Sequence, residues 1–287
     1  MAHYILEAFE VDFSYANGAK ALDKVNLQVQ QGEKLAILGA NGAGKSTLFL
    51  HFNGIHRPYS GQIKYKDSPI AYNNKALIDL RKKVGIVFQD PDSQLFSASV
   101  WQDISFGPLN LGLPKEEVIR RVKQAMAATE TADLENKPTH MLSYGQKKRV
   151  AIAGILAMEP EVIILDEPTA GLDPRHAREF MKLLNKLNLA GTTILMSTHD
   201  VDLAYSWTDR IAVMNQGKVI GWGEPAEIFN QSQLLSQADL TLPLILEVQA
   251  DLVQKGWLPA AAPLPRNLEE LLDSIPEMYP LKAHRCV

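Results

Sequence analysis

Cysteine is almost absent from this sequence, because Cys286 is the only thiol among 287 residues. A single cysteine can form neither an intramolecular disulfide nor a thiolate cluster for zinc. We therefore expect no disulfide scaffold and no structural zinc site. This cysteine usage is typical of proteins from the reducing cytosol.

Long apolar runs and a strong charge of one sign are also missing. The longest unbroken apolar run covers residues 150–158, which is short of the about 18 residues that a membrane-spanning helix needs. Residues 1–7 lack the basic region and apolar core of a signal peptide, so the protein is expected to stay inside the cell. The net charge is −4, from 29 basic and 33 acidic residues. Such a balance creates no global field toward nucleic acid or anionic lipid, which disfavours a DNA- or RNA-binding role.

Three glycines fall within a nine-residue stretch between an apolar, strand-like run and a helix-like run. The stretch consists of Gly39, Ala40, Asn41, Gly42, Ala43, Gly44, Lys45, Ser46 and Thr47. Its glycines allow the backbone N–H groups to converge on phosphate oxygens, Lys45 can reach the terminal phosphates, and the Ser46 hydroxyl can bind Mg²⁺. Glycine-rich turns are common between strands and helices, but here the phosphate-loop pattern is complete and in its strand-loop-helix context. The stretch predicts a nucleotide site.

The hydrophobic pattern predicts an α/β fold with a mostly parallel core sheet. Alternation over residues 4–29 indicates an N-terminal antiparallel β subdomain, with its turn at 16–18. Continuous apolar runs such as 162–165 are typical of buried parallel strands. Strand signals stop over about 90–158, which indicates an inserted helical subdomain. We expect the catalytic domain to cover 1–225 and a small C-terminal appendage to cover 226–287, with helical stripes at 245–252 and 268–275.

Two adjacent carboxylates follow the apolar run 162–165. At the carboxyl edge of a parallel sheet, Asp166 is placed to hold Mg²⁺ and Glu167 to deprotonate the water that attacks the terminal phosphate. An acidic loop at a strand end is common on any surface. Beside a phosphate loop, however, the catalytic interpretation is favoured.

His199 and Gln89 also follow predicted strands, so both can face the same phosphate. A lone histidine is more often structural, and Gln89 alone would indicate nothing. At this sheet edge, an imidazole can donate a hydrogen bond to phosphate or orient the water, and the Gln89 side chain can contact Mg²⁺ or the attacking water.

These motifs together resemble those of an ATP-binding cassette (ABC) ATPase, a phosphate-loop NTPase, over residues 1 to about 225. The resemblance adds a signature turn, which consists of Ser143, Tyr144, Gly145 and Gln146. It implies that two ATPs lie between two chains, each against one chain's phosphate loop and the signature turn of the other. It also implies that Tyr15 stacks on adenine and that Asp173 belongs to a loop that crosses the dimer. Tyr144 stands where the family more commonly has glycine.

Residues 88–96, followed by 106–110, resemble the extra Gln-loop helix of energy-coupling-factor importer ATPases. The resemblance implies a surface that grips a transmembrane partner, formed by Pro91, Asp92, Gln94, Leu95 and Phe96. The simpler alternative is an acidic, aromatic surface loop with no special role. An apolar group that includes Leu95, Phe96 and Phe106 favours the interface.

Residues 147–154 and the appendage resemble the cobalt and nickel members, in which one kind of ATPase subunit pairs with itself. The resemblance therefore implies a homodimer that uses ATP and Mg²⁺, with Ser46, Gln89 and Asp166 as metal contacts. The seven histidines are scattered, so the transported metal would bind in membrane partners.

We expect an ATPase subunit that is peripheral to the membrane, on its cytoplasmic face, and drives cobalt import with a transmembrane coupling protein and a substrate-binding membrane component. Nickel or vitamin import by the same machinery remains an alternative. A rival class is a soluble ABC ATPase that acts on nucleic acid. Such proteins usually carry long coiled-coil insertions or two cassettes in one chain, and this sequence has neither.

Overall fold

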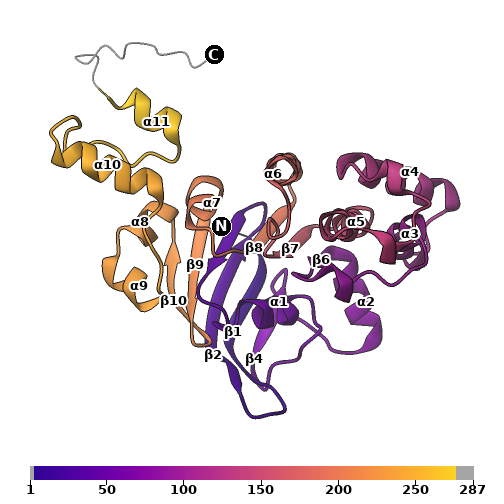
Figure 1. The fold of residues 1–287 in the computed structure, drawn as a ribbon. Helices are drawn as coiled ribbons and strands as arrows, with labels where there is room; N and C mark the ends of the chain where they lie inside the picture. Colours follow the sequence, from indigo (N-terminus) through magenta and orange to yellow (C-terminus); the bar gives the residue numbers. More distant parts are fainter. Residues whose placement is uncertain (1–2, 276–287) are drawn as a thin grey trace, which may run out of the picture.

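A six-stranded sheet forms the centre of the computed structural model, which describes residues 3–275 (Figure 1). Four of its five neighbouring strand pairs are parallel, and only β10 with β9 is antiparallel. The strands, in sheet order, are β10 (Lys218–Gly223), β9 (Arg210–Asn215), β3 (Lys34–Leu38), β8 (Thr193–Ser197), β7 (Val162–Asp166) and β6 (Val84–Val87). Every residue of β6, β7 and β8 is buried, because helices or a second sheet cover both faces. The predicted fold class is confirmed.

A second, antiparallel sheet packs against one side of this core, as the alternation near the N-terminus predicts. Its strands, in order, are β2 (Lys20–Gln30), β1 (Tyr4–Ser14), β4 (Ser60–Tyr65) and β5 (Ser68–Pro69). Its inward residues, among them Leu6, Val11 and Leu22, share one hydrophobic cluster with α1 (Lys45–Phe52) and the core sheet. The helix after the phosphate loop is therefore held between the two sheets.

Helices α6 (Pro174–Leu189) and α7 (Val201–Trp207) contribute to a second hydrophobic cluster with the core sheet. The remaining helix before the insertion is α2 (Asn74–Lys83). The helical insertion has a hydrophobic cluster of its own, which includes Ile104, Val122 and Val150. Its elements are η1 (Pro91–Ser93), α3 (Val100–Asn110), α4 (Lys115–Ala128), η2 (Ala132–Leu134), η3 (Thr139–Met141) and α5 (Tyr144–Leu156).

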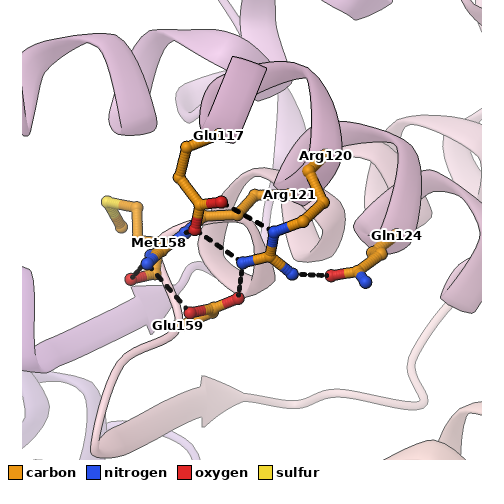
Figure 2. Close-up of polar contacts among 6 residues, drawn as sticks. All are labelled: Glu117, Arg120, Arg121, Gln124, Met158 and Glu159. Atoms are coloured by element: carbon orange, nitrogen blue, oxygen red, sulfur yellow. Dashed lines mark hydrogen bonds and ion pairs between the residues drawn. The ribbon is translucent and has the colours of Figure 1, made fainter. Parts of the chain in front are cut away.

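Surface ion pairs fasten α4 to the turn that follows α5 (Figure 2). The Nη2 of Arg120 lies 3.3 Å from Glu159 Oε1, and the Nη2 of Arg121 lies 3.0 Å from Glu159 Oε2. Arg121 also donates to the main-chain oxygen of Met158 at 3.4 Å. Hydrogen bonds from Arg120 and Arg121 lower the pKa of Glu117 to about 2. Exposed pairs contribute little individually, and α4 also packs on α5 through the hydrophobic cluster that includes Val122 and Val150.

Four short helices follow β10: α8 (Pro225–Phe229), α9 (Ser232–Gln237), α10 (Leu244–Gln254) and α11 (Leu268–Asp273). The last two match the predicted stripes. The first two were not predicted, since each is shorter than two helical turns, and they pack through Ile228, Phe229 and Leu234 on the core-sheet cluster. In Figure 1, α10 and α11 lie beyond the β10 edge, while α3 and α4 lie at the β6 end. Cys286 and the end of the expected appendage are outside the described residues. Between residues 3 and 275, no helix is both long and apolar enough to cross a membrane.

Candidate active site

The phosphate loop joins β3 to α1 and has a backbone that only glycine can supply. Gly39, Gly42 and Gly44 have φ values of 145°, 81° and 105°, a region that L side chains rarely adopt. A Cβ on Gly39 would lie 2.1 Å from the main-chain oxygen of Met214. No side chain caps α1, whose N-cap residue is Gly44. The first N–H groups of α1 and the helix dipole therefore face the loop and favour an anion there.

A cavity of about 460 Å³ opens in front of this loop. It brings together residues that lie up to 152 positions apart in the chain, from Tyr15 to Glu167. Its lining consists of Tyr15, Ala19, Lys20, Ala21, Asn41, Gly42, Ala43, Gly44, Lys45, Ser46, Thr47, Gln89, Asp166 and Glu167. Of the sequence-predicted phosphate-loop residues, those at 41–47 all line it, whereas Gly39 and Ala40 do not.

The side chain of Lys45 is folded back on its own loop. Its Nζ donates to the main-chain oxygens of Gly39 at 2.7 Å and Ala40 at 3.1 Å. Burial lowers the pKa of Lys45, and the nearby carboxylates of Glu167 and Asp166 oppose that shift. The ammonium is thus held at the loop by carbonyl oxygens.

Asp166 and Glu167 are buried at the carboxyl end of β7 and share one hydrogen-bond partner on β8. The Ser197 hydroxyl donates to the Asp166 carboxylate and accepts from the Glu167 N–H at 3.0 Å. Glu167 has φ 48°, the strained left-handed region for a residue with a side chain. That turn directs two adjacent side chains toward one cavity, where regular strand geometry would place them on opposite faces. Sequence reasoning predicted the carboxylates but not Ser197.

His199 contacts Glu167 at the rim of the cavity. Its Nδ1 lies 3.0 Å from Glu167 Oε2, with the histidine side chain 77% exposed and the glutamate side chain 8% exposed. The structure therefore brings His199 to the predicted base, although His199 does not itself line the cavity.

Three oxygen donors around the cavity suit a hard cation. The Ser46 hydroxyl, the Asp166 carboxylate and the Gln89 side-chain amide all line it, and Mg²⁺ prefers oxygen ligands completed by phosphate and water. No group of three or more His, Cys, Asp or Glu side chains within residues 3–275 could hold a metal ion. The donor set fits Mg²⁺ bound together with a nucleotide.

Tyr15 stands at the entrance, where its hydroxyl and the Thr47 hydroxyl are 2.9 Å apart. Its ring meets Phe13 and His56 edge-on, with centroids at 5.2 and 5.8 Å. The His51 and His56 rings are 5.6 Å apart. The histidines that look scattered in the sequence thus contribute two members to an aromatic group behind the Tyr15 ring.

The signature turn begins α5 with a reciprocal cap. The Ser143 hydroxyl accepts from the Gln146 N–H at 3.4 Å, and the Gln146 side chain accepts from the Ser143 N–H at 3.0 Å. This capping box defines the start of the helix. None of Ser143, Tyr144, Gly145 or Gln146 lines the cavity of the same chain.

Asp173 serves as the N-cap of α6 and accepts from the N–H groups of Arg175 and His176 at 3.0 Å. Two hydrogen bonds from His176, the stronger from its main-chain N–H and the other from its side chain, lower the pKa of Asp173 to about 2. Asp173 does not line the cavity either.

The residues expected to face a membrane partner have mixed surroundings. Pro91 is buried, Leu95 packs against the helical cluster, and Gln94 accepts from the Phe88 N–H at 3.0 Å. Asp92 is exposed and forms an ion pair with Lys147. Pro91 is therefore buried and presents no surface to a partner, and Leu95 presents only part of its side chain. The expectation differed for these two residues because a sequence pattern cannot distinguish a side chain that anchors a loop from one that projects from it.

Phe96 is 65% exposed and meets Phe106 edge-on, with the centroids 4.7 Å apart. The two rings border an apolar groove of about 420 Å³ between α2, α3 and α5. The groove is lined by Ile78, Arg81, Lys82, Gln94, Phe96, Asp103, Phe106, Gly107, Asn110, Leu111, Ala151, Gly154, Ile155 and Met158.

Comparison with known proteins gives consistent matches. A family model described as "ABC transporter" matches residues 22–170. The energy-coupling factor transporter ATP-binding protein EcfA of Methanocaldococcus jannaschii is 53% identical, over 89% of this chain and 92% of the relative. EcfA2 of Clostridium perfringens is 50% identical, over 89% and 90%.

Two solved structures extend the similarity to the fold. The structure of cbiO1 from Clostridium perfringens, described as part of the ABC transporter complex cbiONQ, is 50% identical with a TM-score of 0.72, covering 86% of this chain and 99% of that one. The dimeric ATP-binding cassette MJ0796 in a post-hydrolysis state, with ADP and Pi bound, is 29% identical with a TM-score of 0.71, covering 77% and 98%.

Proposed function

Because this chain belongs to the ABC transporter family, as an ATP-hydrolysing subunit of the energy-coupling factor type, we propose that it works as a homodimer around two Mg·ATP and drives import of a transition-metal ion, with cobalt first. The similarity to cbiO1, which is described as part of a cbiONQ complex, supports this choice. Nickel and vitamins are the alternative substrates, since the names of the EcfA relatives specify none.

Residues 1–225 would form the catalytic domain, with the helical insertion at about 90–158, and 226–287 the accessory region. In the catalytic domain, the adenine would stack on the exposed ring of Tyr15. The N–H groups of the phosphate loop and Lys45 would bind the phosphates. Ser46, Asp166 and Gln89 would hold Mg²⁺, which neutralises phosphate charge when bound.

Hydrolysis would use Glu167 as the general base. Its carboxylate would take a proton from a water molecule while the water oxygen attacks the γ-phosphorus and the bond to the β–γ bridging oxygen breaks. His199, whose Nδ1 lies 3.0 Å from Glu167 Oε2, would orient that carboxylate, and in its protonated form it would also donate a hydrogen bond toward the phosphate. The observation that carries this role is the buried Glu167 side chain, which is turned into the cavity by a left-handed backbone.

Dimerisation would complete the site. Ser143 and Gly145 begin a helix whose free N–H groups attract phosphate, yet neither residue lines its own cavity. They would bind the γ-phosphate of the ATP held by a second chain. The loop that ends at Asp173 would lie at the interface between the two chains. The similarity to the dimeric ATP-binding cassette MJ0796, which has ADP and Pi bound, supports a dimer.

A transmembrane coupling protein would dock in the apolar groove beside Phe96 and Phe106, through cytoplasmic helices, together with a substrate-binding membrane component. The exposed aromatic pair at this groove supports the assignment, because apolar surface of this kind favours burial in an interface. The subunit would then be peripheral to the membrane, on its cytoplasmic face.

The Glu167→Gln variant tests the function. It should bind ATP as tightly as the wild type, lose at least about 100-fold in turnover, and accumulate as an ATP-bound dimer in sedimentation. Glu179→Gln, at an exposed position on α6, is the matched control. Unchanged hydrolysis would remove Glu167 from the base role. Uptake of labelled cobalt, nickel and vitamins by cells that contain the co-purifying membrane proteins would decide the substrate.

A further inference from the structure

The side chain of Tyr144 turns toward its own chain. Its hydroxyl donates to the main-chain oxygen of Gln89 at 3.0 Å. Its ring covers Gly171, where an added Cβ would lie 2.2 Å from Tyr144 Cε1. The second residue of the signature turn therefore contacts two loops of its own chain, one before η1 and one before α6.

Lys148 lies one helical turn further along α5, on the same face as Tyr144. It is fully buried, and its Nζ donates to the main-chain oxygen of Glu167 at 2.5 Å. Burial lowers the pKa of Lys148 to about 8, while the carboxylates of Glu167 and Asp166 oppose that shift. Burying an ammonium without a hydrogen-bond partner costs free energy. The bond to the main-chain oxygen of Glu167 must therefore be kept, and it restrains both α5 and the left-handed backbone of Glu167.

The intervening face of α5 adds a third connection. Lys147 forms an ion pair with Asp92, three residues after Gln89. Asp92 is exposed, so this pair contributes little on its own. Together with the two hydrogen bonds, however, it joins the start of α5 to the loops at 89–92 and 167–171.

We propose that Tyr144 and Lys148 are positioning residues that connect the signature turn of each chain to the catalytic loops of that same chain. This inference rests on the proposed function. When the signature turn closes on the ATP held by the partner, the start of α5 would carry the movement to Gln89, Glu167 and Gly171 of its own chain. Contact between one chain's signature turn and the ATP bound by its partner would thereby affect how fast that chain hydrolyses its own ATP.

The arrangement explains the departure from glycine at position 144. Glycine there would offer neither the hydroxyl for Gln89 nor the ring that covers Gly171. The helix start would then be connected to its own active site only through the lysines. The extra side chain adds contacts within the chain, while Ser143 stays exposed and Gly145 half-buried.

Mixed dimers made from two differently tagged chains distinguish a role within the chain from a role across the dimer. The reference dimer pairs a wild-type chain with a Glu167→Gln chain, so one site works. In the first test dimer, Tyr144→Phe is placed on the chain that keeps Glu167. In the second, Tyr144→Phe is placed on the Glu167→Gln chain, so the altered signature turn faces the working site.

The inference predicts that turnover falls about fivefold in the first test dimer, the factor that corresponds to one lost neutral hydrogen bond, with KM for Mg·ATP within about twofold. The second test dimer should match the reference. Equal slowing in both dimers, slowing in the second alone, or no change in either would overturn the inference. Tyr59→Phe, which removes the same atom from an exposed tyrosine, is the control.

Two further measurements keep the test decisive. In homodimers that carry Glu167→Gln, adding Tyr144→Phe should leave ATP-driven dimerisation within about twofold, whereas a marked loss would mean that Tyr144 acts on the partner's ATP. Lys148→Met keeps most of the buried volume and removes the Nζ donor. It should lower turnover about tenfold when placed on the chain that keeps Glu167, and not when placed on the Glu167→Gln chain. Wild-type hydrolysis by the Glu167→Gln homodimer would instead refute the proposed function, and this inference with it.

Discussion

Lowering the pH from 7 to 5 is expected to destabilise the fold through His51, a side chain on α1 with no exposed surface. Its Nδ1 contacts the main-chain oxygen of Thr47 at 2.7 Å, and its buried Nε2 has no hydrogen-bond partner. The edge-on Phe13 ring lies beside it, with the centroids 4.7 Å apart. The neutral form with the proton on Nδ1 suits these surroundings, whereas the charged form would leave an N–H unpaired.

Burial lowers the pKa of His51 from 6.5 to about 4. Between these two values the unfolded chain binds the proton and the folded chain does not, so stability is lost as the pH falls through that window. Evaluating the linkage relation with these two pKa values gives a loss of about 2 kcal/mol between pH 7 and pH 5.

Urea denaturation of the wild type and of His51→Phe at both pH values isolates this contribution. Phenylalanine cannot take up a proton, and the Thr47 carbonyl keeps its helical hydrogen bond. The difference in unfolding free energy between the two proteins should therefore shift by about 2 kcal/mol in favour of the variant as the pH falls. Titrating groups that do not interact with His51 cancel in that comparison, whereas His56, whose charge also lowers the pKa of His51, does not. An unchanged difference at pH 5 would refute the assignment of a depressed pKa to His51.

Two further predictions concern the partner groove and the core. Phe96→Glu should release the subunit from its membrane partner without changing its thermal unfolding. Phe9→Glu, at another exposed phenylalanine, should leave the subunit bound to that partner. Co-purification of Phe96→Glu with the partner at full yield would exclude the groove as the docking site. Arg210→Met should destabilise the protein by about 3–5 kcal/mol, because the buried Glu33 carboxylate would lose its bidentate partner at 2.8 and 3.0 Å. Adding Glu33→Gln should restore part of that stability in urea denaturation, and no restoration would mean that packing, not charge, sets the loss.

Most helices and strands, and the site residues that one chain supplies by itself, could be predicted because short stretches of sequence encode them. The phosphate loop is encoded by its own glycines, and the run before Asp166 can form only a buried strand. Helix α3 was not predicted by periodicity, since Gly107 and Pro108 ordinarily argue against a helix interior, yet the helix packs Ile104 into the helical cluster. Its stability comes from tertiary packing, which overrides local preference.

Contacts between distant segments account for what sequence reasoning missed. Nothing in the run of Lys147, Lys148 and Arg149 distinguishes the middle residue, yet the structure buries Lys148 against the main-chain oxygen of Glu167. His51 and His56 likewise look unremarkable until the chain places their rings behind Tyr15. Local propensity and periodicity carry no information on which residue of a polar run faces inward.

The folded-back position of Lys45 bears on how tightly nucleotide can be held. Its ammonium already has two acceptors, the oxygens of Gly39 and Ala40, so an arriving phosphate must displace them rather than meet an unbound cation. Binding is then an exchange of hydrogen bonds, and only their difference adds to affinity. When the product leaves, the same carbonyls take the ammonium back. These carbonyl oxygens therefore compete with any bound phosphate for the Lys45 ammonium, which weakens the hold on product as well as on substrate.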